Sequence, residues 1–303
     1  MKKKLLLSGV LIFLLSCGRN EKITEETGLQ NQDLLSQTEN GLKKPFKKMI
    51  FRNLEDIKDS EELNLELLSK VASSLKIKYS TIRIRETSSI DYDDKTAFIV
   101  LTTVEHNKKI LKSEGEKQFE DYFQRKYLFV NKEDGCVIAE EFDDNLGYYD
   151  NESVRFSKSH ILKDLVYLNE TTPAIAFYTE ASASSRIVLY SEKKFTLLTL
   201  DNNEIKKVLY EYPIYLTNGD SNGNGTFEIE TLETGISFGD QKNNGYYDLI
   251  VTKNFSYEQA IESDPENGIE EHSNLQTKKE SEKLKYNGSE YAFHRDDRHR
   301  FLE

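Results

Sequence analysis

The 303-residue sequence is poor in several residue types, and each shortage excludes a class of protein. Two cysteines are too few for the disulfide framework of a small secreted domain. The 41 Lys and Arg are outnumbered by 53 Asp and Glu, and phosphate recognition rests on clustered cations, so we expect no nucleic-acid partner. With only 37% hydrophobic residues, the chain is not a multi-span membrane protein.

Aromatic residues, in contrast, are plentiful. The chain has 17 Tyr and 16 Phe, whose rings need burial, so it is not a disordered acidic chain. A compact chain of this length buries roughly three quarters of its unfolded surface and can build a full core. Four prolines interrupt it, and Pro173 and Pro213 stand where strand edges or bends are allowed.

The first seventeen residues predict a signal peptide and a lipid anchor. Three lysines precede a twelve-residue, mostly apolar stretch, residues 5–16, which fits a secretory signal and is too short to span a membrane. Leu14-Leu15-Ser16-Cys17 resembles the bacterial lipobox, in which diacylglycerol is attached to the cysteine and a peptidase cuts before it. The alternative is an ordinary signal peptide that contains a cysteine.

A lipid anchor at Cys17 would attach the chain to a membrane without a spanning helix, because two or three acyl chains anchor a protein stably. Gly18, in place of Asp, follows the cysteine and resembles the sorting pattern of outer-membrane lipoproteins. We therefore expect a cell-envelope protein, lipid-anchored in the outer membrane.

The rest of the chain predicts a mainly β, antiparallel fold of about a dozen strands with one N-terminal helix. Residues 17–50 form a polar tether, residues 51–150 a region with the helix and strands, and residues 151–303 a β region that could continue the same domain. The helix is expected at 60–76, capped by Asp59 or Ser60. A sandwich, a barrel and a small propeller all stay open.

Strand and turn signals alternate from residue 77 onward. Residues 96–104 are apolar on both faces, as in a buried central strand, and hairpins are expected around 131–135, 191–194, 201–204 and Asn287-Gly288. Residues 256–283 are polar and acid-rich and predict a long exposed excursion between strands.

No catalytic motif is visible in the sequence. It has no Gly-x-Ser-x-Gly, no His-Glu-x-x-His, no glycine-rich phosphate loop and no Cys-x-x-Cys, and its five histidines share no metal-ligand spacing. Cys136 is expected as a small buried residue. We expect a protein without enzymatic activity; a glycan hydrolase, which needs two carboxylates across a cleft, is the less favoured alternative.

Two loops rich in Asp, Asn and Gly are candidates for Ca²⁺ sites. The first offers oxygen ligands at Asp220, Asn222, Asn224 and Glu228, and the second at Asp240, Asn244 and Asp248. The second resembles the calcium loops of integrin-type propeller blades. Lys242 stands at a ligand position and neither loop closes like an EF-hand, so we expect millimolar affinity at best. The alternative is that both loops are simple turns between strands.

The run from about residue 95 to residue 293 resembles a family of Gram-negative periplasmic and lipoprotein chains. The matching stretches include 127–135, 174–178 and 186–190, and the most specific pair is Asn244-Gly-Tyr-Tyr-Asp-Leu-Ile-Val251 followed by Leu284-Lys-Tyr-Asn-Gly-Ser-Glu-Tyr291. The resemblance implies an envelope location and a β-rich body, and no functional residue comes with it because the family has no assigned activity.

The leading functional hypothesis is a lipid-anchored envelope protein that binds a protein or glycan partner without catalysis. Its candidate exposed aromatic residues are Tyr148, Tyr149, Tyr246 and Tyr247. The alternative for each tyrosine pair is that one ring lies in the core and the other covers a strand edge. A calcium-stabilised β module is the second hypothesis.

Overall fold

The computed structural model describes residues 48–60, 63–106, 121–143, 154–156, 159–183, 185, 187–263, 265–268 and 270–294. All belong to one compact unit, Pro45–Glu303. Its helical elements are η1 (Leu54–Asp56), α1 (Leu65–Ser74), η2 (Tyr79–Thr81) and η3 (Ile84–Glu86). Its strands are β1 (Met49–Phe51), β2 (Ser88–Asp91), β3 (Thr96–His106), β4 (Asp121–Asn131), β5 (Val137–Phe142), β6 (Val154–Phe156), β7 (His160–Ile161), β8 (Val166–Tyr167), β9 (Pro173–Ala183), β10 (Ser191–Asp201), β11 (Glu204–Ser221), β12 (Phe227–Asn243), β13 (Tyr246–Ile261) and β14 (His272–Leu284).

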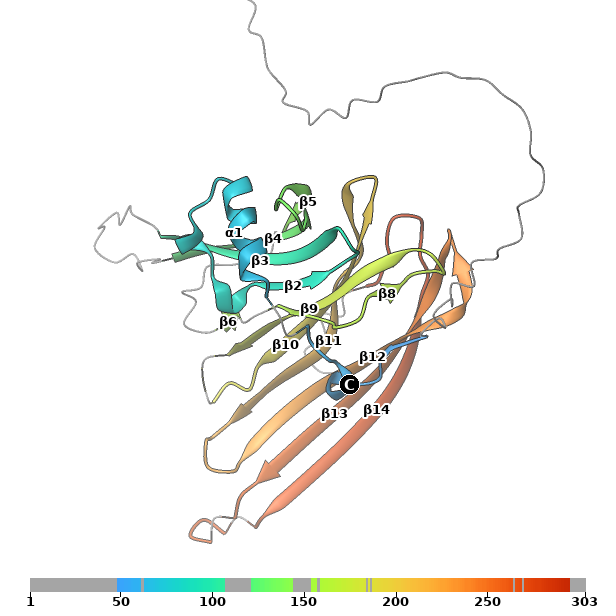
Figure 1. Ribbon diagram of the computed structural model, residues 1–303. Helices are drawn as coiled ribbons and strands as arrows, with labels where there is room; N and C mark the ends of the chain where they lie inside the picture. The colour runs from blue at the N-terminus through green and yellow to red at the C-terminus, as the bar shows by residue number, and fades with distance from the viewer. Residues whose placement is uncertain are drawn as a thin grey trace, which may run out of the picture. The chain divides into compact units, whose positions relative to one another are not determined.

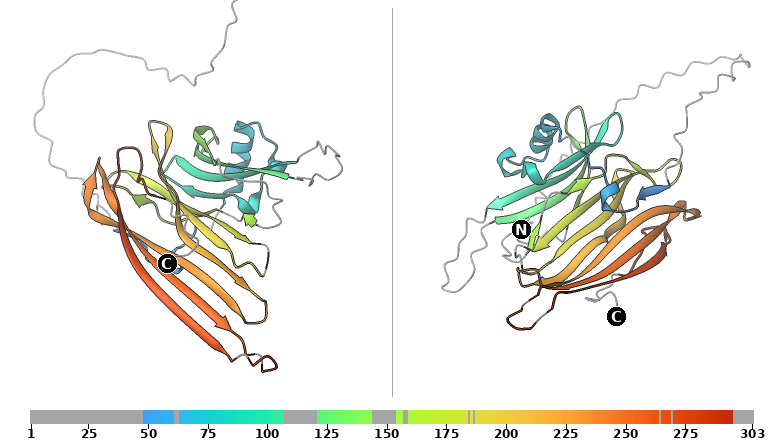
Figure 2. Two further views of the ribbon diagram at one scale, coloured as in Figure 1. Left: turned by 180° about the vertical axis from the view of Figure 1, so that it is seen from behind. Right: turned by 90° about the horizontal axis from the view of Figure 1, so that it is seen from below.

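The strands form two antiparallel sheets with open, linear strand orders, which confirms the mainly β prediction. The small sheet has the order β2-β3-β4-β5. The large sheet runs β14-β13-β12-β11-β10-β9-β6, with β1 added to β12 and with β7 and β8 added to β9. Figure 1 shows β9 to β14 in this order across the large sheet, and Figure 2 shows β11 to β14 side by side as long strands.

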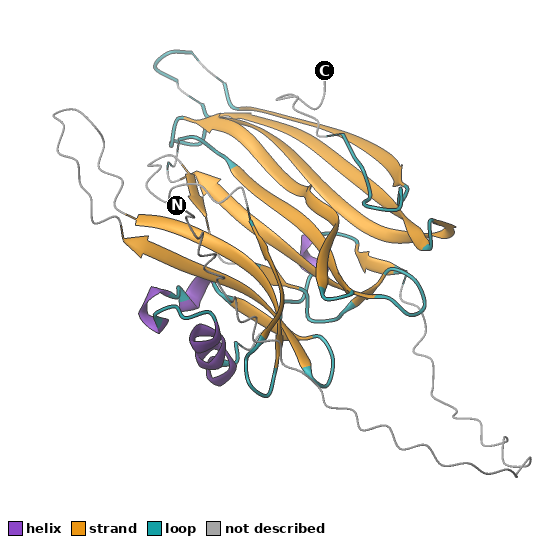
Figure 3. Ribbon diagram, turned by 90° about the horizontal axis from the view of Figure 1, so that it is seen from above, coloured by secondary structure: helices purple, strands orange, loops and turns teal. Residues whose placement is uncertain are grey.

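The small sheet lies between α1 and the large sheet (Figure 3). On one face, Ile99 and Leu128 pack with Leu68 and Val71 of α1. On the other face, the aromatic side chains of Phe98, Tyr127 and Phe129 pack against β9 and β10 of the large sheet. These strands contribute Ile175, Phe177 and Leu198 to the same cluster. The prediction of a buried central strand at residues 96–104 is confirmed, because β3 packs against α1 on one face and against the large sheet on the other.

The large sheet has its own core, closed by the two ends of the described chain. Phe51 of β1 meets Phe195 of β10 edge to face at 5.2 Å. The segment after β14 turns back at Asn287-Gly288, where Tyr286 pairs with Tyr291, and the Tyr291 N–H donates to the Val208 carbonyl at 2.7 Å. The turn predicted at Asn287-Gly288 is therefore present.

The helix begins later than predicted. Asn64 caps α1, since its Oδ1 accepts the Leu67 N–H at 3.0 Å. The cap predicted at Asp59 or Ser60 is wrong because other contacts engage these side chains: Asp59 pairs with His160, and the Ser60 hydroxyl donates to the Ser89 carbonyl.

Two loop predictions are also wrong. Residues 191–194 are not a turn but the start of β10, paired on both sides with β9 and β11. Residues 256–283 are not one excursion, because β13 and β14 pair in continuous register from Leu249↔Leu284 to Ile261↔His272. The side chains of this segment are mostly polar, so the sequence shows no alternation of apolar and polar residues that would indicate strands. The strands form through backbone hydrogen bonds between β13 and β14.

No helix among the described residues is long and apolar enough to cross a membrane.

Candidate functional site

A small pocket of about 210 Å³ lies between the N-terminal strand and the segment before β9. One wall is β1 and the stretch after it, and the other is the stretch that ends in β8. The lining residues are Met49, Ile50, Asp56, Ile57, Lys58, Leu162, Lys163, Asp164, Leu165, Val166 and Tyr167. Seven of these are apolar or aromatic and four are charged, and Met49 and Tyr167 are exposed, so the pocket offers both apolar and charged side chains to solvent.

Backbone contacts hold the two walls together at the far end of the pocket. Asp59 forms a β-bridge with Leu162, the Lys163 N–H donates to the Lys58 carbonyl at 2.8 Å, and the Ser60 N–H donates to the Ile161 carbonyl at 2.7 Å. β1 is held in turn by β12, where Met49 is the partner of Ser237. Secondary structure therefore fixes both walls.

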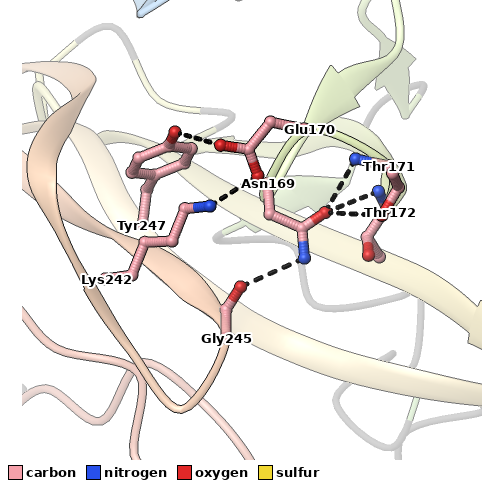
Figure 4. Close-up of polar contacts among 7 residues, drawn as sticks. All are labelled: Asn169, Glu170, Thr171, Thr172, Lys242, Gly245 and Tyr247. Atoms are coloured by element: carbon pink, nitrogen blue, oxygen red, sulfur yellow. Dashed lines mark hydrogen bonds and ion pairs between the residues drawn. The ribbon is translucent and has the colours of Figure 1, made fainter.

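A polar network joins the turn after β8 to the hairpin between β12 and β13 (Figure 4). Glu170 is its centre: Tyr247 donates its hydroxyl to Glu170 Oε1 at 2.6 Å, and Lys242 Nζ contacts Oε2 at 2.5 Å. Asn169 donates to the Gly245 carbonyl at 3.1 Å. We call these five residues, Asn169, Glu170, Lys242, Gly245 and Tyr247, the Glu170 network.

The sequence builds each side of this network locally. Asn169 Oδ1 accepts the N–H groups of Thr171 and Thr172, at 2.9 and 2.7 Å, and so closes the turn that presents Glu170. On the other side, Asn244 and Gly245 have φ of 47° and 92°, the positive values that a tight two-residue hairpin requires. The Tyr247 N–H then donates to the Leu168 carbonyl, which joins the two turns through the backbone.

Charge pairing stabilises the ionised forms in the network. The hydrogen bond from Lys242, followed by that from Tyr247, lowers the pKa of Glu170 to about 2. The same contact with Glu170 raises the pKa of Lys242 and of Tyr247. Lys242 also lies over the Tyr247 ring, 4.6 Å from its centroid. Glu170 therefore stays a carboxylate and Lys242 an ammonium at any physiological pH.

The network and the pocket lie close together along the chain. Tyr167 of the pocket is followed directly by Leu168 and Asn169, and Lys48 precedes Met49. Lys48 pairs with Asp240, a contact that raises the pKa of Lys48 and lowers that of Asp240. The pocket itself combines apolar side chains with charges of both signs, and Asn169 of the Glu170 network follows its last lining residue, Tyr167, by two positions.

The first predicted calcium loop is a turn with two neighbouring carboxylates. Asp220 and Glu228 are direct cross-strand partners on β11 and β12. Asn222 Oδ1, however, accepts the N–H groups of Asn224 and Thr226 at 2.8 and 3.1 Å and so stabilises the turn. The structure therefore brings two of the four predicted ligands to paired positions.

In the second predicted loop, the three predicted ligands contact three different partners. Asp240 pairs with Lys48, and Asn244 donates to the Tyr286 carbonyl at 2.9 Å. Asp248 is fully buried, and its Oδ1 accepts from Asn243 at 2.5 Å. Within the described part of the chain, no group of three or more His, Cys, Asp or Glu side chains is arranged to hold a metal ion.

The other predicted residues have mixed outcomes. Tyr246 and Tyr247 are both half-buried and pack against the large core, and Tyr246 lies 4.4 Å from Tyr286, ring to ring. Cys136 is exposed, so the prediction of a buried thiol is wrong: it follows the hairpin turn directly and precedes β5. Cys17, Tyr148 and Tyr149 lie outside the described residues.

Sequence reasoning missed the pocket and Glu170. Both depend on segments more than seventy residues apart, such as 169–170 and 242–247, and no local motif marks such a contact. The Asn169-Glu170-Thr171-Thr172 turn was the one available signal, because an Asn two or three residues before backbone N–H groups favours a turn.

Comparison with known proteins finds no matching family model, no matching curated protein and no matching solved structure.

Proposed function

We propose that this chain is a lipid-anchored protein of the bacterial cell envelope that acts as a non-enzymatic binding module. The pocket supports the binding role, because it combines accessible apolar side chains with four charged residues, and backbone contacts hold its two walls together. The lipobox-like ending at Cys17 supports the anchor, and the polar residues from Cys17 to the start of β1 would hold the binding surface away from the bilayer.

The anchor is tested by expressing the full chain in a Gram-negative host and separating membranes from soluble fractions. We expect the wild-type chain in the outer-membrane fraction and the Cys17→Ala chain in the soluble fraction. Cys136→Ala is the matched control and should stay with the membrane. Equal membrane association of Cys17→Ala would contradict the anchor.

The paired acids Asp220 and Glu228 favour a calcium-stabilised module as the second candidate. Like charges directly opposite each other on neighbouring strands destabilise a sheet, and a bound cation would remove that repulsion. Ca²⁺ in millimolar excess should then raise the melting temperature of the wild-type chain, and EDTA should reverse the rise. Asp220→Asn should lose the effect. No change with Ca²⁺ would eliminate this candidate.

A further inference from the structure

We propose that the pocket binds an extended peptide segment of a partner protein, which inserts one large uncharged apolar side chain between β1 and β8. This inference rests on the proposed binding role and names the class of partner. It is carried by the volume of the pocket, the charge balance at its rim and the strand edges that form its walls.

The volume suits one side chain better than a whole ligand. At about 210 Å³, the pocket is smaller than the roughly 300–1,000 Å³ of small-molecule sites. It exceeds the roughly 150 Å³ that an apolar cavity needs to hold a benzene ring. A Phe or Leu side chain therefore fits, with Met49 and Tyr167 exposed at the mouth to cover it.

The charges at the pocket favour an uncharged occupant. Asp56 and Asp164 are balanced by Lys58 and Lys163, so the lining carries no net charge. An anionic or cationic group would meet equal attraction and repulsion there.

The walls provide edges for a peptide backbone. Within the described residues, β1 pairs only with β12, and β8 pairs only with β9. The Lys48 carbonyl accepts the Phe238 N–H from β12, so alternation along the strand turns the backbone N–H and C=O of Met49 away from β12. An extended segment can add to such an edge through its main chain while a side chain enters the pocket.

The methionine content supplies a direct reporter. The chain has only two methionines, Met1 and Met49, and Met49 lines the pocket. The chain carrying Cys17→Ala, labelled with ¹³C at the methionine methyl groups, should give a Met49 signal, plus one for Met1 where the signal peptide is retained, and Met49→Leu identifies the Met49 signal. The probes are the capped peptides acetyl-Gly-Phe-Gly-amide and acetyl-Gly-Gly-Gly-amide, together with N-acetylglucosamine.

We expect the Phe peptide to shift the Met49 signal saturably at millimolar concentration, while the Gly peptide and N-acetylglucosamine leave it unchanged. Leu165→Trp, or Ile57→Trp if the first variant melts at a lower temperature, fills the pocket and should abolish the shift. Leu275→Trp adds the same side chain at an exposed site of β14 and should preserve it.

Three outcomes would overturn the proposal: no shift with the Phe peptide, a shift that survives filling of the pocket, or a shift with N-acetylglucosamine alone. Each can be separated from failure of the anchor, because membrane attachment through Cys17 is measured on other samples. A shift with N-acetylglucosamine alone would retain a binding module with a glycan partner.

Discussion

His160 is the residue whose surroundings most clearly predict a pH effect. Its Nδ1 lies 2.5 Å from Asp59 Oδ2 and its Nε2 lies 3.6 Å from Glu180 Oε2, while its ring stacks on Tyr178 at 4.7 Å. The hydrogen bonds to Asp59 and then Glu180 raise the pKa of His160 from 6.5 to about 9, and Lys193 also contacts Glu180. The imidazolium ties the segment before α1 to β9.

The sign of the pH dependence follows from this shift. Because the pKa of His160 is higher in the folded state, its charged contacts contribute fully to the free energy of unfolding below about pH 6.5. This contribution is lost as the pH rises through about 9. We expect His160→Gln to lower the free energy of unfolding by about 1 kcal/mol at pH 6, a small value because the group is partly solvated.

The measurement is urea unfolding of the wild type and His160→Gln from pH 6 to pH 10. The difference between the two should shrink towards zero above pH 9. His272→Gln, at the exposed start of β14, is the matched control and should follow the wild type throughout. A constant difference at all pH values would show that His160 acts through packing instead.

At the scale of elements, two glycines with positive φ differ in the space around them, so that replacing each by Ala distinguishes the cost of backbone strain from the cost of a steric clash. Gly245 has φ of 92°, and a Cβ there would meet no atom within 4 Å. Gly135, in the turn between β4 and β5, has φ of 72°, and a Cβ there would lie 2.5 Å from Lys70 Cβ and 2.7 Å from the Lys70 carbonyl carbon. This turn therefore touches the backbone of α1.

Gly245→Ala should cost about 1 kcal/mol of unfolding free energy, because only the left-handed conformation is penalised. Gly135→Ala should cost about 1–3 kcal/mol more, because α1 must also move away from the hairpin. Urea denaturation of both variants measures the difference. Equal losses would mean that α1 yields freely and that the contact with Lys70 is unimportant for stability.

The elements that the sequence predicts well are those with a local signal. Residues 96–104 are apolar on both faces at their centre and lie in β3, which is covered on both faces. Asn202 and Asn203, with φ of 52° and 63°, form the predicted turn between β10 and β11. β14 gave no such signal, since most of its side chains are polar and exposed and its pairing with β13 is made by the backbone.

In the candidate site, too, the residues with a local sequence signal could be predicted and those brought together by the tertiary fold could not. Tyr246 and Tyr247 could be named from the sequence because an Asn-Gly turn presents them, but their partner Glu170 could not, because only the tertiary fold brings it to Tyr247. For the predicted calcium ligands, spacing along the chain correctly suggested turns, while the direction of each side chain depends on partners such as Lys48 and Tyr286.

For the whole molecule, the contact between the two sheets includes one buried ion pair. Arg125 of β4 and Asp143, just after β5, have side chains that are 4% and 3% exposed, and Arg125 Nη1 lies 3.1 Å from Asp143 Oδ2. Tyr210 of β11 donates its hydroxyl to Asp143 Oδ1 at 3.3 Å, so the pair connects the small sheet to the large one. Burial, followed by the charge of Asp143, also raises the pKa of Tyr127 well above its usual value.

Removal of one partner should be far more costly than removal of both. Arg125→Met leaves Asp143 charged and buried, so we expect a loss of about 3–5 kcal/mol of unfolding free energy, whereas the double variant Arg125→Met/Asp143→Leu should recover most of it.

Lys132→Met, which breaks the exposed pair with Asp91, is the control and should cost at most about 1 kcal/mol. Urea unfolding, followed by far-UV circular dichroism and by tyrosine fluorescence, measures all three. If the double variant were as unstable as Arg125→Met, the polar contact itself, through Tyr210, would hold the sheets together, and the aromatic core between them would be insufficient on its own.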